Sequence, residues 1–147
     1  MDKVEIEIGL DFMAAEQEVT ESRKPAEIGD YTLQVIEIRA SASGPTSKVP
    51  GRPMLGWELA IIGHPTYNGK RVFYNTMLPY ADPNNGNKLN TSGISFLVDI
   101  TKALGQPWQG GKLRTEEYIG KTCRATLGIE VNPKTGEQRN SIGKVFA

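Results

Sequence analysis

Aromatic and basic side chains are the residues of this sequence with the most evident chemistry, and they are densest around one predicted turn and the strand after it. Tyr67, Lys70, Arg71 and Phe73 lie within one stretch of seven residues. Cations bind phosphates, and flat rings stack on nucleobases with roughly 1 to 3 kcal/mol per base. Their types therefore indicate contacts with nucleic acid. Further residues of these types complete the predicted surface: Lys48, Arg52, Trp57, Arg124, Lys134, Arg139 and Lys144.

The side chains of a strand alternate between two faces, so the neighbours Phe73 and Tyr74 cannot both contact a ligand. Phe73 shares its face with Arg71 and Asn75, which are polar, whereas the face of Tyr74 is mostly apolar. We therefore expect Phe73 to be exposed and available for stacking, and Tyr74 to be buried.

Two other aromatic residues differ in their surroundings. Trp57 is in register with Leu59 and Ile61, so it is interpreted either as a core residue or as a base-stacking residue. Tyr67 adjoins an Asn-Gly pair, which is typical of a hairpin turn. We expect Tyr67 to be exposed.

The sequence offers little for catalysis or for metal binding. It contains one histidine, His64, and one cysteine, Cys123, so neither a disulfide within the chain nor a cysteine-based zinc site can form. The strings HExxH, GxSxG and GxxxxGKS/T are absent. Cys123 lies on the apolar face of a predicted strand and is interpreted as a core residue. We expect a protein with no enzymatic activity, no cofactor and no bound metal.

A net charge of zero conceals an uneven distribution of charge. Residues 1–30 hold nine acids and three bases, while the remaining residues hold 14 bases and eight acids. An acidic arm thus precedes a moderately basic body. This asymmetry is consistent with a polyanionic partner, and ordinary solvation of a surface is the alternative.

Hydrophobic periodicity predicts five strands and one helix in the body of the chain. The alternation of the first strand slips after Val35, which indicates a bulge. Ser92 or Thr91 is the expected N-cap of the helix, and Gly105 is its expected C-cap residue. Residues 79–92 are polar and are predicted to form a loop. The predicted strands are residues 31–39, 54–62, 71–78, 122–131 and 138–146, and the predicted helix is residues 94–104.

The acidic N-terminal arm, residues 1–27, is predicted to be distinct from the body. Residues 4–12 alternate between apolar and polar side chains, which favours a strand with one buried face. Residues 13–27 are interpreted as a mobile connection. Residues 1–12 are predicted to pair as an extra strand, either with the same barrel or with the exposed edge of a neighbouring molecule. In a second hypothesis, the acidic arm folds over the basic body and competes with nucleic acid.

The order of the predicted elements is strand, strand, strand, helix, strand, strand. It favours a mainly β fold, namely a five-stranded OB-fold-like barrel with one helix between strands three and four. The barrel covers residues 28–147 and the arm is an N-terminal extension. OB-folds commonly bind ligands over their second and third strands and the adjoining loops, which is where the aromatic and basic residues are densest.

Residues 28–147 resemble small phage-encoded single-stranded-DNA-binding proteins of the OB-fold type. The resemblance rests on Gly-Asp-Tyr at residues 29–31, Tyr-Asn-Gly-Lys-Arg at 67–71, Ile-Gly-Lys at 119–121 and Arg-Asn at 139–140. It implies cooperative, sequence-tolerant coating of single strands during phage DNA replication or recombination, without catalysis or a metal. The contacts implied by position are Tyr67, Lys70, Arg71, Phe73 and Arg139.

A non-enzymatic assembly or adaptor protein is the alternative function, and it would bind other proteins through its barrel and its N-terminal strand. The expected partners are single-stranded DNA, replication or recombination proteins, and further copies of the chain. No apolar run reaches the roughly 18 residues of a membrane span. We expect no membrane association and a cytoplasmic location, in the host cell if the protein is phage-encoded.

Overall fold

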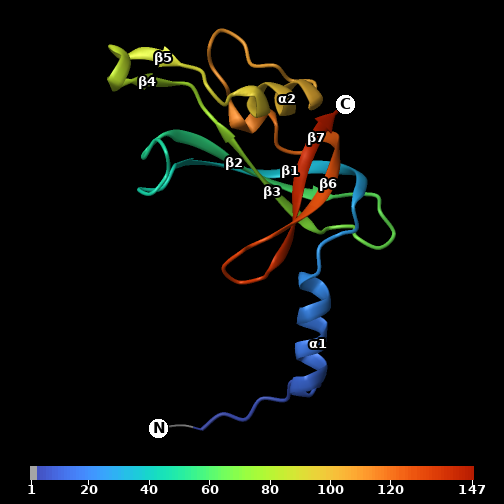
Figure 1. Ribbon diagram of the computed structural model, residues 1–147. Coiled ribbons are helices and arrows are strands. Elements are labelled where there is room, and N and C mark those ends of the chain that lie inside the picture. Colours follow the sequence, from blue (N-terminus) through green and yellow to red (C-terminus); the bar gives the residue numbers. More distant parts are fainter. Residues whose placement is uncertain (1–2) are drawn as a thin grey trace.

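The computed structural model describes residues 3–147 and is mainly β (Figure 1). Its main sheet has five antiparallel strands in the order β3-β2-β1-β6-β7, and a small two-stranded sheet pairs β4 with β5. The elements are α1 (Phe12–Arg23), β1 (Gly29–Ala42), β2 (Pro53–Ile61), β3 (Arg71–Met77), β4 (Tyr80–Asp82), β5 (Lys88–Asn90), α2 (Ser95–Ala103), β6 (Thr122–Val131) and β7 (Gln138–Phe146), with 3-10 turns at Pro83–Asn85 and Thr115–Glu117.

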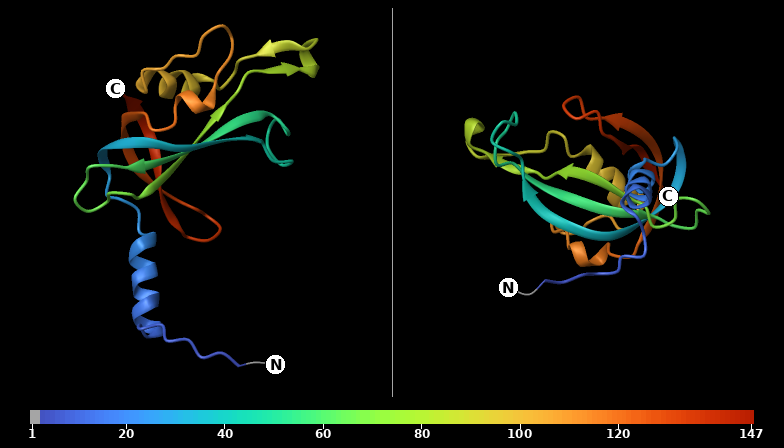
Figure 2. Two further views of the ribbon diagram at one scale, coloured as in Figure 1. Left: turned by 180° about the vertical axis from the view of Figure 1, so that it is seen from behind. Right: turned by 90° about the horizontal axis from the view of Figure 1, so that it is seen from below.

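Strand β1 joins the two halves of the sheet. Its first part, from Gly29 to Gln34, pairs with β6, and its longer second part pairs with β2. The register with β2 shifts between Val35 and Glu37, which confirms the bulge predicted from the sequence. A bulge bends its strand and increases the local twist, so the sheet curls strongly (Figure 2).

The inner face of the curled sheet carries the core. Trp57 is completely buried, and its indole Nε1 donates a hydrogen bond of 2.8 Å to Thr76 Oγ1 on β3. The ring of Tyr118 packs edge-on against Trp57 at 5.6 Å, and its hydroxyl donates to the carbonyl of Gln106. A buried polar group needs such a partner. Both large aromatic residues are therefore fixed by packing and by hydrogen bonds.

Helix α2 covers one end of the curled sheet, and α1 extends from the opposite end (Figure 1). Leu97 and Ile100 of α2 are buried in the core, and Gly105 follows the helix with φ +73°, as the sequence predicted. The N-cap differs from the prediction: it is Ile94, whose side chain makes no capping bond. The Ser92 hydroxyl instead accepts a hydrogen bond from the buried Arg52, whose Nη1 lies 3.4 Å from Oγ.

The sheet does not close into a barrel. The edge strands β3 and β7 approach each other, but within residues 3–147 no hydrogen-bonded ladder joins them. A seam between β3 and β7 therefore remains, and it is the main open feature of the fold.

The N-terminal arm differs from the sequence-based prediction. Residues 3–8 have no regular secondary structure, and the helix α1 occupies most of the segment that was interpreted as a mobile connection. The Asp11 carboxylate caps this helix by accepting a hydrogen bond of 2.8 Å from the Ala14 amide, and alanine, glutamate and glutamine are strong helix formers. For residues 3–12 the predicted pairing with the chain's own barrel is wrong, because none of them is in a strand and the segment lies away from the sheet (Figure 1). Residues 1 and 2 lie outside the described residues.

Residues 79–92, predicted to be a loop, form a projecting hairpin of β4 and β5. The Asp82 carboxylate holds the turn by accepting from the Asn84 amide at 2.9 Å and from the Asn90 side chain at 3.2 Å. Side-chain hydrogen bonds of this kind stabilise turns. The polar composition that indicated a loop comes from these turn-forming residues.

None of the helices within residues 3–147 combines the length and the apolar character needed to cross a membrane.

The burial of Cys123 generates a testable prediction. Its thiol is only 3% exposed, and burial raises its pKa to about 11. The neutral form is favoured in the fold, so this contribution to stability is complete below the ordinary thiol pKa of 9.0 and is lost as the pH rises through about 11.

We expect iodoacetamide to label the folded protein very slowly near pH 8, because the thiolate is the reactive form. Labelling in guanidinium should be rapid, and mass spectrometry measures both rates. Fast labelling of the folded chain near pH 8 would contradict the burial of Cys123.

Candidate nucleic-acid interface

A basic groove opens at the seam, where β3 and β7 begin. It has a volume of about 520 Å³ and lies between the β2–β3 turn, the first residues of β7 and the segment that follows α1. Because five basic residues and one acid line it, its charge favours an anionic ligand. The basic residues are Arg23, Lys24, Lys70, Arg71 and Arg139, and the acid is Glu137.

The β2–β3 turn positions two of these cations. Gly69 has φ +88°, a conformation that favours glycine, and its amide donates to the Ile61 carbonyl at 2.7 Å. The Asn68 side chain accepts a hydrogen bond of 2.8 Å from the Gly63 amide. These bonds fix the turn, so Lys70 and Arg71 start β3 at the edge of the groove.

Tyr67 also lines the groove, but it is half-buried rather than exposed as expected. Its ring stacks on His64 at 5.0 Å and meets Tyr31 edge-on at 6.0 Å. The His64 Nδ1 atom accepts hydrogen bonds from the amides of Thr66 and Tyr67. Burial, followed by the nearby Tyr67 and Glu27, raises the pKa of Tyr31. The Tyr67 ring is therefore packed against two other rings.

Phe73 is exposed on the outer face of the sheet, two residues beyond Arg71. Its exposed fraction is 62%, while Val72 on the opposite face is buried, which confirms the predicted alternation. The carboxylate of Glu58, its partner on β2, lies 3.9 Å from Arg71 and 3.7 Å from Arg39. Phe73 is therefore opposite a glutamate that lies near two arginines.

Hydrogen bonds from Asn140 on β7 attach the segment after α1 to the sheet. The Asn140 side chain accepts from the amide of buried Ala26 at 2.8 Å and donates to the Ala26 carbonyl at 2.9 Å. This attachment brings Arg23 and Lys24 to the groove. Neither cation is among the residues predicted from the sequence, because both lie in the segment that is predicted to be mobile. Two adjacent bases before a proline in an acidic arm were the available signal.

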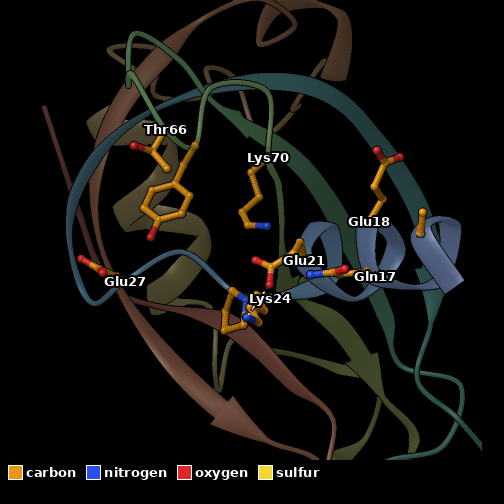
Figure 3. A pocket seen from close by; sticks show the side chains of 10 residues that line it. Gln17, Glu18, Glu21, Lys24, Glu27, Thr66 and Lys70 are labelled. Atoms are coloured by element: carbon orange, nitrogen blue, oxygen red, sulfur yellow. Dashed lines mark hydrogen bonds and ion pairs between the residues drawn. The ribbon is translucent and has the colours of Figure 1, made fainter.

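A second cavity, of about 920 Å³, adjoins the groove and has a different charge (Figure 3). It lies between α1 and the β2–β3 turn, and Glu18, Glu21 and Glu27 line it together with Lys24 and Lys70. The Lys24 Nζ atom lies 2.8 Å from Glu21, and Lys70 points toward the helix (Figure 3). The acids of α1 therefore border the basic groove directly.

Two predicted contacts are corrected by their burial. Trp57 is completely buried in the core, so its ring cannot stack on a base. Arg52 is only 9% exposed. Its guanidinium donates hydrogen bonds to the carbonyls of Leu78 and Ser92. Charge alone did not distinguish Arg52 from the exposed cations.

The remaining predicted residues lie outside the groove. Arg124 and Lys144 face outward on β6 and β7, and β6 is three strand positions from β3 in the sheet. The Arg124 guanidinium lies over the Phe146 ring at 5.6 Å. Lys134 lies in the β6–β7 turn, and Lys48 lies in the β1–β2 loop. The structure thus brings together Tyr67, Lys70, Arg71 and Arg139, with Phe73 beside them.

Arg52 holds three parts of the chain together. Its guanidinium donates to the Leu78 carbonyl at the end of β3 and to Ser92, where Nη1 reaches Oγ at 3.4 Å and Nη2 reaches the carbonyl. It also lies over the Tyr80 ring at 4.8 Å. The β1–β2 loop and the projecting hairpin therefore lie side by side (Figures 1 and 2).

Arg52→Ala should lower the free energy of unfolding by about 2 to 3 kcal/mol, because hydrogen bonds to a charged group contribute on this scale. Arg52→Lys should lose most of the same stability, since an ammonium lacks the planar fork of donors. Urea unfolding measures both changes. Lys48→Ala, on an exposed cation of the same loop, is the control, with an expected change within about 0.5 kcal/mol. An Arg52→Ala variant as stable as this control would refute the role.

Comparison with known families identifies a match over almost the whole described chain. Residues 11–145 match a family described as "Protein of unknown function (DUF669)". No curated protein matches the sequence at a significant level. The match includes α1, the strands of the main sheet except the last residue of β7, and every residue that lines the basic groove. The chain, with its curled five-stranded sheet and its basic seam, belongs to the DUF669 family.

Proposed function

We propose that this protein binds single-stranded DNA without strong sequence preference, in phage DNA replication or recombination. One observation carries the proposal: four residues selected from the sequence for nucleic-acid binding line one groove, and exposed Phe73 lies beside it. Cations along a groove together with exposed rings are what sequence-tolerant binding of single strands requires.

The strand order supports the OB-fold as part of this proposal. The OB-fold is a five-stranded, partly open barrel that binds oligonucleotides over its second and third strands. Here the second and third strands of the main sheet are β2 and β3, and α2 lies between the third and fourth strands in sequence. In this interpretation the seam between β3 and β7 is the open part of the barrel.

The proposed path of the DNA follows from the positions of charge and rings. Phosphates contact Arg139, Lys70 and Arg71 along the groove, and a base stacks on Phe73 at the outer face. Binding here competes with acids that already pair with these cations, since Glu58 lies 3.9 Å from Arg71 and Glu130 lies 2.7 Å from Arg139. A phosphate that replaces Glu58 as the partner of Arg71 contributes less binding free energy than a phosphate that contacts a cation with no acidic partner. We therefore expect moderate affinity and strong dependence on salt.

An adaptor protein is the second candidate function. The observation that favours it is the set of exposed apolar side chains before α1, where Val4, Ile6 and Ile8 are each more than 70% exposed. Exposed apolar groups of this kind mark contacts with other proteins. Salt distinguishes the two functions, because binding through phosphate contacts weakens steeply as the salt concentration rises, whereas binding through apolar side chains does not depend on phosphate contacts.

Fluorescence anisotropy with a labelled poly-dT oligonucleotide tests DNA binding. Phe73→Ala should cost about 1 to 3 kcal/mol of binding free energy, through the loss of one stacked base. Arg71→Ala should weaken binding and reduce the salt slope by about 0.7, the contribution of one phosphate contact on a single strand. Unlabelled duplex DNA should compete poorly.

Matched controls separate these effects from general changes of the surface. Phe12→Ala removes an aromatic ring that is 78% exposed but lies on α1. Lys112→Ala removes an exposed cation that does not line the groove. Both should bind like the unmodified chain. The proposal fails if poly-dT does not bind at low salt, or if duplex DNA binds equally well.

A further inference from the structure

The segment Lys3–Ile8 has the composition of a strand without a partner. Val4, Ile6 and Ile8 alternate with the acids Glu5 and Glu7, and their exposed fractions are 78%, 74% and 78%. Such an alternation suits one buried face and one solvated face. In the single chain this apolar face is uncovered.

The same chain holds this segment away from its own sheet. Gly9, with φ +76°, turns the chain between the segment and α1, and the 12 residues of α1 span about 18 Å at 1.5 Å per residue. Figures 1 and 2 show the segment beyond the far end of the helix, remote from every strand. The geometry therefore presents the segment to another molecule.

The seam between β3 and β7 is a suitable acceptor. Its two edge strands are not paired with each other within the described chain, and edge strands readily accept an added strand. Where the seam opens, the basic groove contains Lys70, Arg71 and Arg139. These cations complement the two glutamates of the segment in charge. β3 has seven residues and the segment has six, so the lengths also agree.

We propose that Lys3–Ile8 docks as an added strand at the β3–β7 seam of a second copy of this chain. Donor and acceptor are different surfaces of one chain, so the contact is head-to-tail and generates rings or filaments. The acids of the docked segment occupy cations that the proposed function assigns to DNA. Self-association and DNA binding at the groove are therefore competitive, and this second part of the inference rests on the proposed function.

Light scattering coupled to size exclusion tests the self-association without DNA. We expect a concentration-dependent mass of at least twice the 16.1 kDa of one chain. The double variant Ile6→Lys with Ile8→Lys should elute at the mass of one chain, because it removes the apolar face of the segment. Met13→Lys is the matched control, since Met13 is 80% exposed but lies outside the segment, and it should associate like the unmodified protein.

A mixing experiment tests donor and acceptor separately. The variant Arg71→Glu with Arg139→Glu keeps the segment but reverses charge in the groove, so alone it should also have the mass of one chain. Mixed with the Ile6→Lys, Ile8→Lys variant, which keeps its groove, it should form a pair with the mass of two chains, because one molecule then supplies the intact segment and the other supplies the intact groove. The pair should not grow further, because its remaining segment and its remaining groove are both substituted. A chain carrying all four substitutions, added to the unmodified protein, should therefore not enter the assembly.

A synthetic peptide of residues 3–11 provides the direct probe. The labelled peptide should bind the Ile6→Lys, Ile8→Lys variant, whose groove is intact, and should not bind the Arg71→Glu, Arg139→Glu variant. Circular dichroism should show that both variants are folded. A single-chain mass of the unmodified protein at every concentration, or equal binding of the peptide to both variants, would overturn the docking proposal.

Poly-dT separates this inference from the proposed function. Where both hold, poly-dT displaces the labelled peptide, and the Ile6→Lys, Ile8→Lys variant binds poly-dT more tightly than the unmodified chain. Peptide binding without any poly-dT binding would refute the proposed function alone. Poly-dT binding without peptide binding would refute the docking alone.

Discussion

The bulge in β1 bends the main sheet and so brings its two edge strands toward each other. One strand of 14 residues pairs with β6 from Gly29 to Gln34 and with β2 from Leu33 to Ala42, and the bulge lies within the pairing with β2. A straight strand would give a flatter sheet with β3 and β7 far apart at its two edges. The bend at the bulge curls the sheet, so these edges approach each other without pairing. The seam and its groove are consequences of this curl.

Charge in this protein is organised around that seam. Basic residues from three separate parts of the chain meet there, while the acids of α1 line the adjoining cavity. The net charge of zero therefore gives no indication of the local field. Interactions between exposed charges decay over about 8 Å at physiological salt, so a ligand in the groove responds to the nearby cations more than to the whole molecule.

Polar side chains also determine where the irregular segments lie. Arg52 fixes the β1–β2 loop to the end of β3 and to the hairpin, and Asn140 fixes the segment after α1 to β7. Both side chains satisfy backbone carbonyls that the loops would otherwise leave unpaired. An arginine and an asparagine that look like surface residues in the sequence are in fact structural attachments.

Periodicity alone determined much of this protein. The bounds of β6 and β7, the bulge in β1 and the exposure of Phe73 all follow from the alternation of neighbouring side chains, which is a local property of the chain. The alternation at residues 4–8 was equally clear, yet no strand forms there in the single chain, because a strand also needs a partner edge. Only the tertiary structure decided that Arg52 and Trp57 are buried and that Lys24, Lys70 and Arg139 share one groove. Those outcomes depend on which distant segments the curled sheet brings into contact, and residue type and spacing do not encode that proximity.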